Sequence, residues 1–474
     1  MRKTKIVATI GPSSSSEKMI EKLIKSGVNV FRFNFSHGNH EIHRENLKKV
    51  RDTAKKLKKV VAVLQDLSGP KIRIGQVEEP FYVHYGDILE IIKEPVLGNK
   101  KRISINYPQI LDQLEKGDKL YIADGSIRLE VIEKTKTGIK AKVLVGGLIS
   151  SRKGVNFPNV KLNIPSITEK DKEDIKFGVK EGFDIIALSF VKTADDVIEA
   201  KKLIKEAGGD QPIFAKIEKH EAVEHIDDII QVADGIMVAR GDLGVEIEME
   251  KVPVVQKMII KKCNKAGKPV ITATQMLTSM VSSPRPTRAE VSDVANAVLD
   301  GTDATMLSDE TTVGKYPVEA VKVMAKTIVE TEKIYPYYRD YGVKEKTSTA
   351  AVAKAATDLS KDIKAKAIVA FTKSGRTARN VSKYRPECKI LAITHDEKTL
   401  RRLSIVWGVE PYMVIESNEN TDIMLKEFVI HAYKEDFRPE DTLITLVGFV
   451  GGLTGSTSII RIIRKEDLEQ FLKT

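Results

Sequence analysis

Cysteine, tryptophan and long apolar runs are all scarce in this chain of 474 residues. It contains two cysteines, Cys263 and Cys388, and one tryptophan. Two cysteines in so long a chain argue against a disulfide framework and for a reducing compartment. No segment approaches the roughly 20 apolar residues of a membrane span, and the first residues lack the apolar core of a signal peptide. We therefore expect a cytoplasmic protein with no membrane partner.

Aromatic residues make up 6% of the chain, although its net charge is +11. So few rings leave little surface for stacking nucleic-acid bases. The lysines alternate with glutamates along helical stretches such as residues 44–59, which is typical of solvated helix faces. We expect no nucleic-acid partner, and the positive potential would instead attract phosphorylated metabolites.

One pattern occurs eight times: a short apolar, β-branched run ends in polar residues, and an amphipathic helical pattern follows. The runs are residues 5–11, 28–35, 60–67, 183–190, 212–218, 235–242, 269–275 and 304–310. Nearly continuous apolar strands that alternate with helices indicate a parallel sheet covered by helices. Eight such units favour a closed (β/α)8 TIM barrel of the α/β class over an open sheet.

The pattern changes twice along the chain. Residues 75–150 alternate polar and apolar positions between Gly-Asp and Asp-Gly turns, which predicts an inserted all-β module. Beyond about residue 336 the α/β pattern returns, with apolar runs at 365–372, 389–396, 411–416 and 442–449. We predict a catalytic barrel, an inserted β-barrel lid and a C-terminal α/β domain, at residues 1–70 with 153–335, 71–152 and 336–474 respectively.

Polar side chains gather at the predicted strand ends, which share one mouth in such a barrel. They are Arg32, Asn34, Ser36, Asp66, Lys216, Glu218, Asp242, Thr274 and Glu310. Two carboxylates on adjacent strands, Glu218 and Asp242, suit Mg²⁺ (or Mn²⁺) with substrate oxygens completing its shell. Lys216 faces the same way as Glu218 and would stabilise an oxyanion or a transferring phosphoryl group. A plain ion pair at the barrel rim is an equally weighted alternative for these two residues alone.

Three further motifs have a possible ligand role. Arg32 in "FRFNFSHG" suits phosphate, whereas His37 there is better explained as structural. Gly241 in "ARGDLG" allows close backbone approach where a helix begins, against the alternative of a simple turn. The loop "FTKSGRTARN" (371–380) resembles a phosphate cradle without Walker A spacing, and a helix cap explains it nearly as well.

Together these blocks resemble the pyruvate kinase family. "TKIVATIGPSS", "FRFNFSHG", "GPKIRIG", "KGVNFP", "FAKIEKHEAV", "MVARGDLGVE", "ATQMLTSM" and "LSDETTVGKYP" follow in the family's order over nearly the whole chain. The resemblance implies the same barrel, lid and C-terminal regulatory domain. It also implies phosphoryl transfer from phosphoenolpyruvate to ADP and protonation of enolpyruvate, the last step of glycolysis, usually in a homotetramer.

The resemblance also implies roles for individual residues. Glu218 and Asp242 would hold Mg²⁺, Lys216 would stabilise the phosphoryl group and the enolate, and Thr274 would lie near the protonated carbon. The remaining implied contacts are with the phosphates (Arg32, Arg73), the substrate carboxylate (amides of Ala239, Arg240 and Gly241), the nucleotide (Asn34, Phe35, Ser36, His37, Arg73, Lys153) and the phosphate of an effector (Thr372, Lys373, Ser374, Thr377).

Two positions depart from the family pattern. Asp309 stands where the family usually has glycine, and Lys71 stands where K⁺-dependent members have glutamate. In those members Asn34, Ser36 and Asp66 would ligate K⁺. A nearby ammonium opposes that ion by about 4 kcal/mol at an effective dielectric near 20. We expect Lys71 to substitute for K⁺, as in a K⁺-independent branch of the family.

Two other functions fit part of the pattern. A Mg²⁺-dependent lyase or aldolase acting on pyruvate or phosphoenolpyruvate would share the carboxylates, but it needs no lid or nucleotide clamp. A basic RNA-binding protein on an inactive barrel would not need the intact set of Lys216, Glu218, Asp242 and Thr274. The segment 447–460 does not resemble a fructose-1,6-bisphosphate loop, so a sugar monophosphate, a nucleotide or no activator all remain open.

Overall fold

A computed structural model describes residues 2–342, 347–416, 421–448 and 457–473. Its central domain is a closed barrel of eight parallel strands, which confirms the predicted TIM barrel. Each predicted apolar run contains one strand. The strands are β1 (Lys5–Thr9), β2 (Val30–Asn34), β3 (Ala62–Asp66), β12 (Ile185–Leu188), β13 (Ile213–Ile217), β14 (Gly235–Ala239), β15 (Val270–Ala273) and β16 (Ala304–Leu307).

Helices surround this barrel, and side-chain caps fix where several of them begin. Thr168 and Thr287 form capping boxes, and Gly182 and Gly301 end the same two helices in the left-handed conformation. The long helices are α1 (Glu17–Ser26), α2 (His40–Lys56), α3 (Glu169–Glu181), α4 (Ala194–Glu206), α8 (Val252–Ala266), α9 (Arg288–Asp300) and α11 (Pro317–Glu332). Shorter ones are α5 (His220–Glu224), α6 (Ile226–Val232), α7 (Arg240–Glu246) and α10 (Asp309–Thr312).

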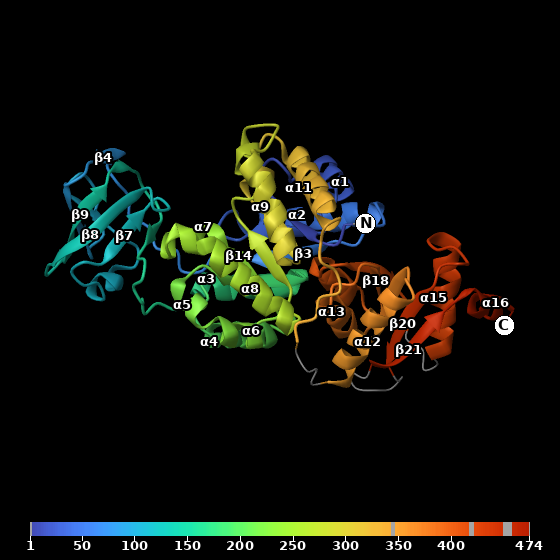
Figure 1. The fold of residues 1–474 in the computed structure, drawn as a ribbon. Coiled ribbons are helices and arrows are strands. Elements are labelled where there is room, and N and C mark those ends of the chain that lie inside the picture. Colours follow the sequence, from blue (N-terminus) through green and yellow to red (C-terminus); the bar gives the residue numbers. More distant parts are fainter. Residues whose placement is uncertain (1, 343–346, 417–420, 449–456, 474) are drawn as a thin grey trace.

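The insertion between β3 and β12 folds around its own apolar core and projects from one side of the barrel (Figure 1). It contains a two-stranded sheet of β4 (Phe81–Val83) and β10 (Gly147–Ile149). The other sheet has six strands: β5 (Ile88–Ile92), β6 (Arg102–Ser104), β7 (Lys119–Ile122), β8 (Ile127–Lys134), β9 (Gly138–Val145) and β11 (Val155–Asn156). Because β11 pairs with β7, this sheet reaches past residue 152.

The C-terminal domain lies on the other side of the barrel and contains a five-stranded sheet (Figure 1). Its order is β19 (Val409–Val414), β18 (Lys389–Thr394), β17 (Ala367–Phe371), β20 (Leu443–Gly448) and β21 (Thr457–Ile463). The antiparallel strand β21 was not predicted from the sequence. The helices are α12 (Ser348–Asp362), α13 (Arg376–Lys383), α14 (Glu397–Arg402), α15 (Thr421–Glu435) and α16 (Lys465–Lys473).

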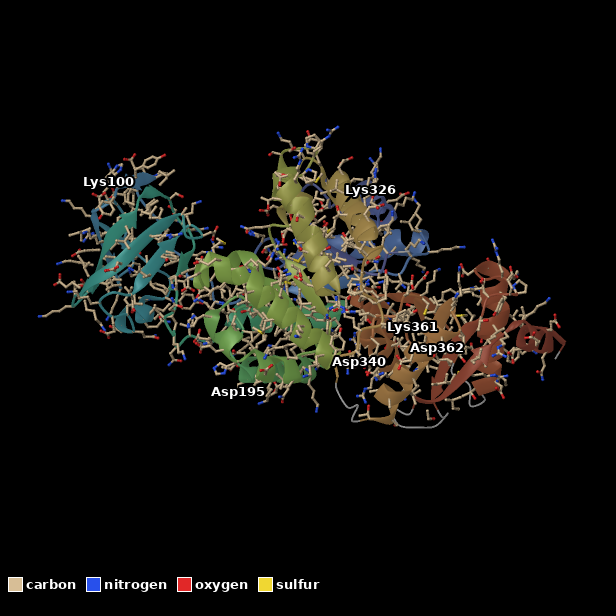
Figure 2. All side chains as sticks on the ribbon, viewed as in Figure 1. Lys100, Asp195, Lys326, Asp340, Lys361 and Asp362 are labelled. Atoms are coloured by element: carbon tan, nitrogen blue, oxygen red, sulfur yellow. The ribbon has the colours of Figure 1, made fainter. Side chains whose placement is uncertain are left out.

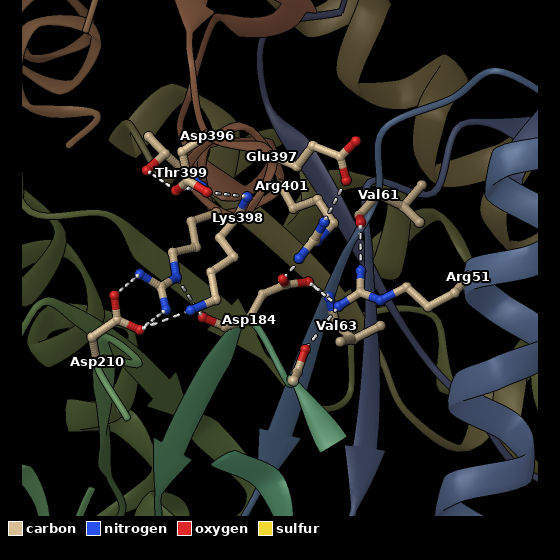
Figure 3. A network of polar contacts seen from close by, with 12 residues as sticks. Arg51, Val61, Val63, Asp184, Asp210, Asp396, Glu397, Lys398, Thr399 and Arg401 are labelled. Atoms are coloured by element: carbon tan, nitrogen blue, oxygen red, sulfur yellow. Dashed lines mark hydrogen bonds and ion pairs between the residues drawn. The ribbon is translucent and has the colours of Figure 1, made fainter. Parts of the chain in front are cut away.

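Ion pairs connect this domain to the end of the barrel where the strands begin (Figure 3). Asp184, just before β12, accepts from Arg51 Nη2 at 2.8 Å and from Arg401 Nε at 2.9 Å. Arg402 Nη2 lies 2.7 Å from Asp210 Oδ1. Asp184 is buried, so removing one of its partners would leave part of a buried charge uncompensated.

Charged side chains of both signs cover all three domains, for example at Lys100, Asp195, Lys326, Lys361 and Asp362 (Figure 2). In the part of the chain that the structure describes, no helix combines the length and apolarity needed to cross a membrane.

Candidate active site

A buried cluster of opposite charges occupies the carboxyl ends of β2, β3 and β13. Lys216 Nζ lies 3.1 Å from Asp66 Oδ1 and 2.8 Å from Glu218 Oε1. Arg32 Nε donates to Asp66 Oδ2 at 2.6 Å. Strand β2 pairs with β3, and β12 pairs with both β3 and β13, so the parallel register brings these strand ends to one side of the barrel, as the sequence pattern predicted. A simple rim ion pair would explain Lys216 with Glu218, but it would not explain the additional contacts with Asp66.

Opposite charges in the cluster keep Lys216 and Asp66 ionised despite their burial. Burial lowers the pKa of Lys216, but Asp66 and Glu218 outweigh it and the net shift is upward. Burial likewise raises the pKa of Asp66, and Lys216 and Arg32 bring it below its ordinary value. Lys216 is thus a permanent ammonium at neutral pH, suited to a developing negative charge.

Ser189 contacts Lys216 and is not among the site residues predicted from the sequence. Its Oγ accepts from Lys216 Nζ at 2.7 Å and donates to the carbonyl of Leu67 at 2.7 Å. Ser189 follows β12 and is the polar residue near the end of the apolar run 183–190. The same reasoning that selected the other strand ends would have identified it.

Asp242 and Glu218 are the pair that fits a divalent cation. Burial and the neighbouring Glu218 carboxylate raise the pKa of Asp242 to about 6, a repulsion that a bound cation relieves. Within the described ranges, no group of three or more His, Cys, Asp or Glu side chains is arranged to hold a metal. Two carboxylates suit Mg²⁺, which completes its shell with waters and substrate oxygens.

Thr274 and the start of α7 are locked to one another. Gly241 N–H donates to Thr274 Oγ1 at 2.8 Å, and that hydroxyl lies 2.7 Å from the carbonyl of Ala273. Arg240 fixes the same turn by donating to the carbonyl of Thr274 at 2.7 Å. Thr274 has φ of +64°, a strained conformation for a β-branched residue that is characteristic of functional sites.

The residues after β2 divide into a buried and an accessible set. Phe35 is buried and stacks on His43, so its ring packs in the barrel wall. Asn34 Oδ1 accepts from Ser36 N–H at 3.1 Å, and His37 is exposed. Partial burial, followed by Lys71 and Arg73, lowers the pKa of His37. His37 thus shares the electrostatic environment of Lys71.

Lys71 lies among the charges of the active site. Burial and Lys216 lower its pKa, while Asp242, Glu218 and Asp66 oppose that shift. It lines a cleft of about 740 Å³ between barrel and lid together with Arg73, Lys153, Lys192 and Asp242. Arg73 Nη1 donates to the carbonyl of Arg152 at 2.9 Å, which orients it from the lid side.

Glu310 does not join this cluster, which corrects the expectation that it faces the mouth. Its carboxylate accepts from the backbone N–H of Leu277 at 3.0 Å and of Ser308 at 2.7 Å. Its neighbour Asp309, at the position usually occupied by glycine, is exposed in the first turn of α10. Glu310 thus supports the loops after β15 and β16.

The predicted effector loop is separated from the active site. Lys373 and Ser374 line a cavity of about 1180 Å³ between the C-terminal domain and the barrel. Thr377 Oγ1 is 2.8 Å from Thr457 Oγ1. Thr372 is buried, and its backbone N–H donates to the carbonyl of Ile393. Most of segment 447–460, namely 449–456, lies outside the described residues.

Comparison with known proteins agrees with this geometry. Residues 1–321 match the family described as pyruvate kinase, barrel domain, and residues 350–463 match pyruvate kinase, alpha/beta domain. Pyruvate kinases of Staphylococcus aureus strains MRSA252 and USA300 are 45% identical over 470 residues, which is 98% of this chain and 80% of each relative. The crystal structure of a pyruvate kinase from Cryptosporidium parvum superposes with a TM-score of 0.91 at 39% identity, covering 98% of this chain and 96% of that one. The chain belongs to the pyruvate kinase family and is a phosphotransferase.

Proposed function

We propose that this enzyme transfers a phosphoryl group from phosphoenolpyruvate to ADP, giving pyruvate and ATP as the last step of glycolysis. The observation that carries the proposal is the buried Lys216 ammonium, held between Asp66 and Glu218 beside Asp242. Phosphoryl transfer depends on positioning and on stabilising negative charge more than on covalent chemistry.

Different residues around the barrel mouth would bind different groups of phosphoenolpyruvate. Glu218 and Asp242 would hold Mg²⁺, which when bound neutralises charge on the substrate oxygens. Lys216 stabilises the transferring phosphoryl group and then the enolate, while Arg32 and Arg73 bind phosphate oxygens. The amides of Ala239, Arg240 and Gly241 receive the substrate carboxylate, and Thr274 orients the proton donor for enolpyruvate.

The nucleotide binds in the cleft between barrel and lid. The backbone and polar groups of residues 34–37 (Asn34, Phe35, Ser36 and His37) would contact the nucleotide from the end of β2, outside the residues that line the cleft. Arg73 and Lys153 come from the lid connections, and both line the 740 Å³ cleft. Two cations at this position suit the diphosphate of ADP.

A coupled assay of pyruvate formation with phosphoenolpyruvate, ADP and Mg²⁺ tests the proposal. We expect turnover that requires all three, and Lys216→Met should lower kcat by about a thousandfold or more because transition-state charge is left uncompensated. The matched control Lys326→Met changes an exposed lysine and should behave as the wild type. Pyruvate release without ADP would instead support the lyase or aldolase alternative. No pyruvate from the wild-type protein would refute the proposal.

We further propose that catalysis needs no K⁺. The Lys71 ammonium lies in the field of Asp66, Glu218 and Asp242, where it supplies the positive charge that a monovalent cation would bring. Equal rates in K⁺ and in a tetramethylammonium salt of the same ionic strength are expected. A large, saturable activation by K⁺ would contradict this.

Regulation through the C-terminal domain is a second proposal, with a phosphorylated metabolite as effector. Thr372, Lys373, Ser374 and Thr377 would form its phosphate loop. Within the described residues the Arg379 side chain forms no hydrogen bond or ion pair, although it lines the cavity beside Lys373. Calorimetry with a sugar monophosphate, AMP or fructose 1,6-bisphosphate tests this, and binding should be lost in Lys373→Met.

We also propose that the enzyme is a homotetramer, as family membership leads us to expect. Sedimentation of the same samples tests this.

A further inference from the structure

Glu246 connects the lid to the barrel through two hydrogen bonds to one buried carboxylate oxygen. Asn156 Nδ2 on the lid strand β11 donates to Glu246 Oε1 at 3.2 Å. Lys219 Nζ, directly after the predicted metal ligand Glu218, reaches the same oxygen at 2.6 Å. Glu246 is 1% exposed and ends α7, the helix that carries Asp242 in its first turn. Three separate parts of the site therefore meet at one carboxylate.

This carboxylate is held as an anion. Burial alone would raise the pKa of Glu246, but contacts with His220, Lys219 and Asn156 outweigh it and leave the pKa below its ordinary value. A buried charge of this kind constrains its partners strongly, because losing either one leaves part of the charge uncompensated.

The connection into the lid approaches Lys219 through the Phe190 ring. Lys219 Nζ lies 6.0 Å from the centre of the Phe190 ring, a cation–π distance. That ring packs so closely on Gly69 that a Cβ there would lie 2.5 Å from Phe190 Cδ2. Gly69 begins the connection into the lid, and Asn156 lies on the connection out of it.

The two connections are themselves paired. Val155 N–H donates to the carbonyl of Ile72 at 2.9 Å, and Ile74 N–H to the carbonyl of Lys153 at 3.0 Å. The lid is therefore connected to the barrel by a two-stranded stem. This stem contacts the barrel rim at Glu246 and its partner Lys219. The stem also bears Arg73 and Lys153, the cations that face the cleft.

We propose that Lys219, Glu246 and Asn156 form a positioning clamp that fixes the lid stem, and so sets the fraction of molecules whose lid is placed to bind the nucleotide. The clamp rests on the proposed function, since it acts on ADP binding. Asn156 and Lys219 also line the cleft. In the clamp they act on the nucleotide by placing Arg73 and Lys153, and they do not touch the reacting atoms.

Loss of the clamp should appear in KM and not in kcat. When the competent lid position is populated less, apparent nucleotide affinity falls by that fraction, whereas saturating ADP restores it. Phosphoenolpyruvate is held mainly by barrel groups, namely Lys216, Arg32 and the amides of residues 239–241, and depends on the stem only through Arg73. Its KM should therefore change less than the KM for ADP. A purely structural role would lower stability without this selective change.

The test compares Asn156→Ala, Lys219→Met and Lys219→Arg with a control, Lys119→Met, which removes a pair with Glu130 inside the lid. We expect Asn156→Ala and Lys219→Met each to raise KM for ADP by about three- to tenfold, with kcat within about twofold of wild type. Lys219→Arg retains the ion pair and should restore a KM near wild type. The double variant should fall short of the product of the single effects, because both act through Glu246.

Hydrogen exchange of the same proteins gives a readout that does not require turnover. Amides of Ile74 and Val155 should exchange faster in Asn156→Ala, while amides of the lid strands β8 and β9 keep their protection. An unchanged KM for ADP, or an equal loss of kcat with both KM values intact, would overturn the clamp. If wild-type protein makes no pyruvate, the proposed function fails, and exchange alone then decides the clamp: slow stem exchange in Asn156→Ala would refute it.

Discussion

Lys216, which is buried, and Lys71, which is half-buried, lie in one site and have opposite pKa shifts. Two carboxylates within 3.1 Å raise the pKa of Lys216. Burial and Lys216 lower the pKa of Lys71, which has more distant carboxylates. The first lysine is suited to permanent charge, whereas the second balances the negative field of the pocket. Replacing one charge in this pocket should therefore change which ions it accepts.

Lys71→Glu should make the enzyme dependent on K⁺. The substitution reverses a charge beside Asp66, Glu218 and Asp242, so the pocket becomes more negative and a monovalent cation is needed to restore its balance. We expect activity in tetramethylammonium to fall by about tenfold or more and to recover with K⁺. Initial rates across a K⁺ titration at constant ionic strength measure this. Lys71→Met serves as the control for lost charge without reversal, and a Lys71→Glu enzyme indifferent to K⁺ would contradict the prediction.

Individual elements follow closely from their apolar runs, because strand positions in a barrel are buried on both faces. The eight runs each contain a strand, and polar residues at their ends locate Lys216 and Asp66. Strand β21 was missed because it pairs antiparallel at the sheet edge, follows a glycine-rich segment and buries only its end residues, Thr457 and Ile463. Glu310 was misplaced because a sequence shows the end of a strand but not whether backbone N–H groups turn a side chain away.

Helix α3 contains a glycine, Gly178, that allows the helix to pack closely against strand β3. A Cβ on Gly178 would lie 1.9 Å from Gln65 Oε1 of β3, and Gln65 Nε2 donates to the carbonyl of Asp174 at 2.6 Å. Alanine improves helix propensity by about 1 kcal/mol, whereas overpacking a buried site costs about 1–3 kcal/mol. The steric term should therefore exceed the propensity term.

Gly178→Ala should lower the melting temperature by a few degrees, as measured by scanning calorimetry. Lys176→Ala, at an exposed position on the same helix, should leave it nearly unchanged. Combining Gly178→Ala with Gln65→Ala removes the clash and should recover part of the loss. A more stable Gly178→Ala protein would show that propensity dominates at this position.

At the scale of the whole molecule, the three domains were predicted from changes in periodicity, but their contacts were not. Asp184, Arg51 and Arg401 come from distant parts of the chain, and nothing in their local sequences distinguishes them from solvated charges (Figure 3). The same holds for Asn156 and Glu246, which are 90 residues apart. Such pairs depend on tertiary packing, whereas strand ends depend on local pattern.

Lys5 connects the barrel to the C-terminal domain, and we expect its buried amine to make the stability of the protein depend on pH. Its Nζ donates to the carbonyl of Val409 at 2.5 Å from a fully buried position. Burial, followed by the nearby Arg2, lowers the pKa of Lys5 from 10.5 to about 7. Between these two values the unfolded chain holds a proton on Lys5 that the folded protein does not. The contribution of this group to stability therefore rises with pH through that window and is smallest below it.

Lys5→Met removes this titration and should change the pH dependence in a defined direction. From pH 7 upward the wild type should gain stability relative to Lys5→Met by up to about 1.4 kcal/mol per pH unit, because one proton separates the two states. Thermal unfolding of both proteins at several pH values between 6 and 9.5 measures the difference in their unfolding free energy. The contributions of other titrating groups cancel in that difference. Lys25→Met, at an exposed lysine on α1, should instead run parallel to the wild type. Parallel curves for Lys5→Met would show that Lys5 remains protonated in the folded protein, and the barrel would then hold a buried ammonium at every pH measured.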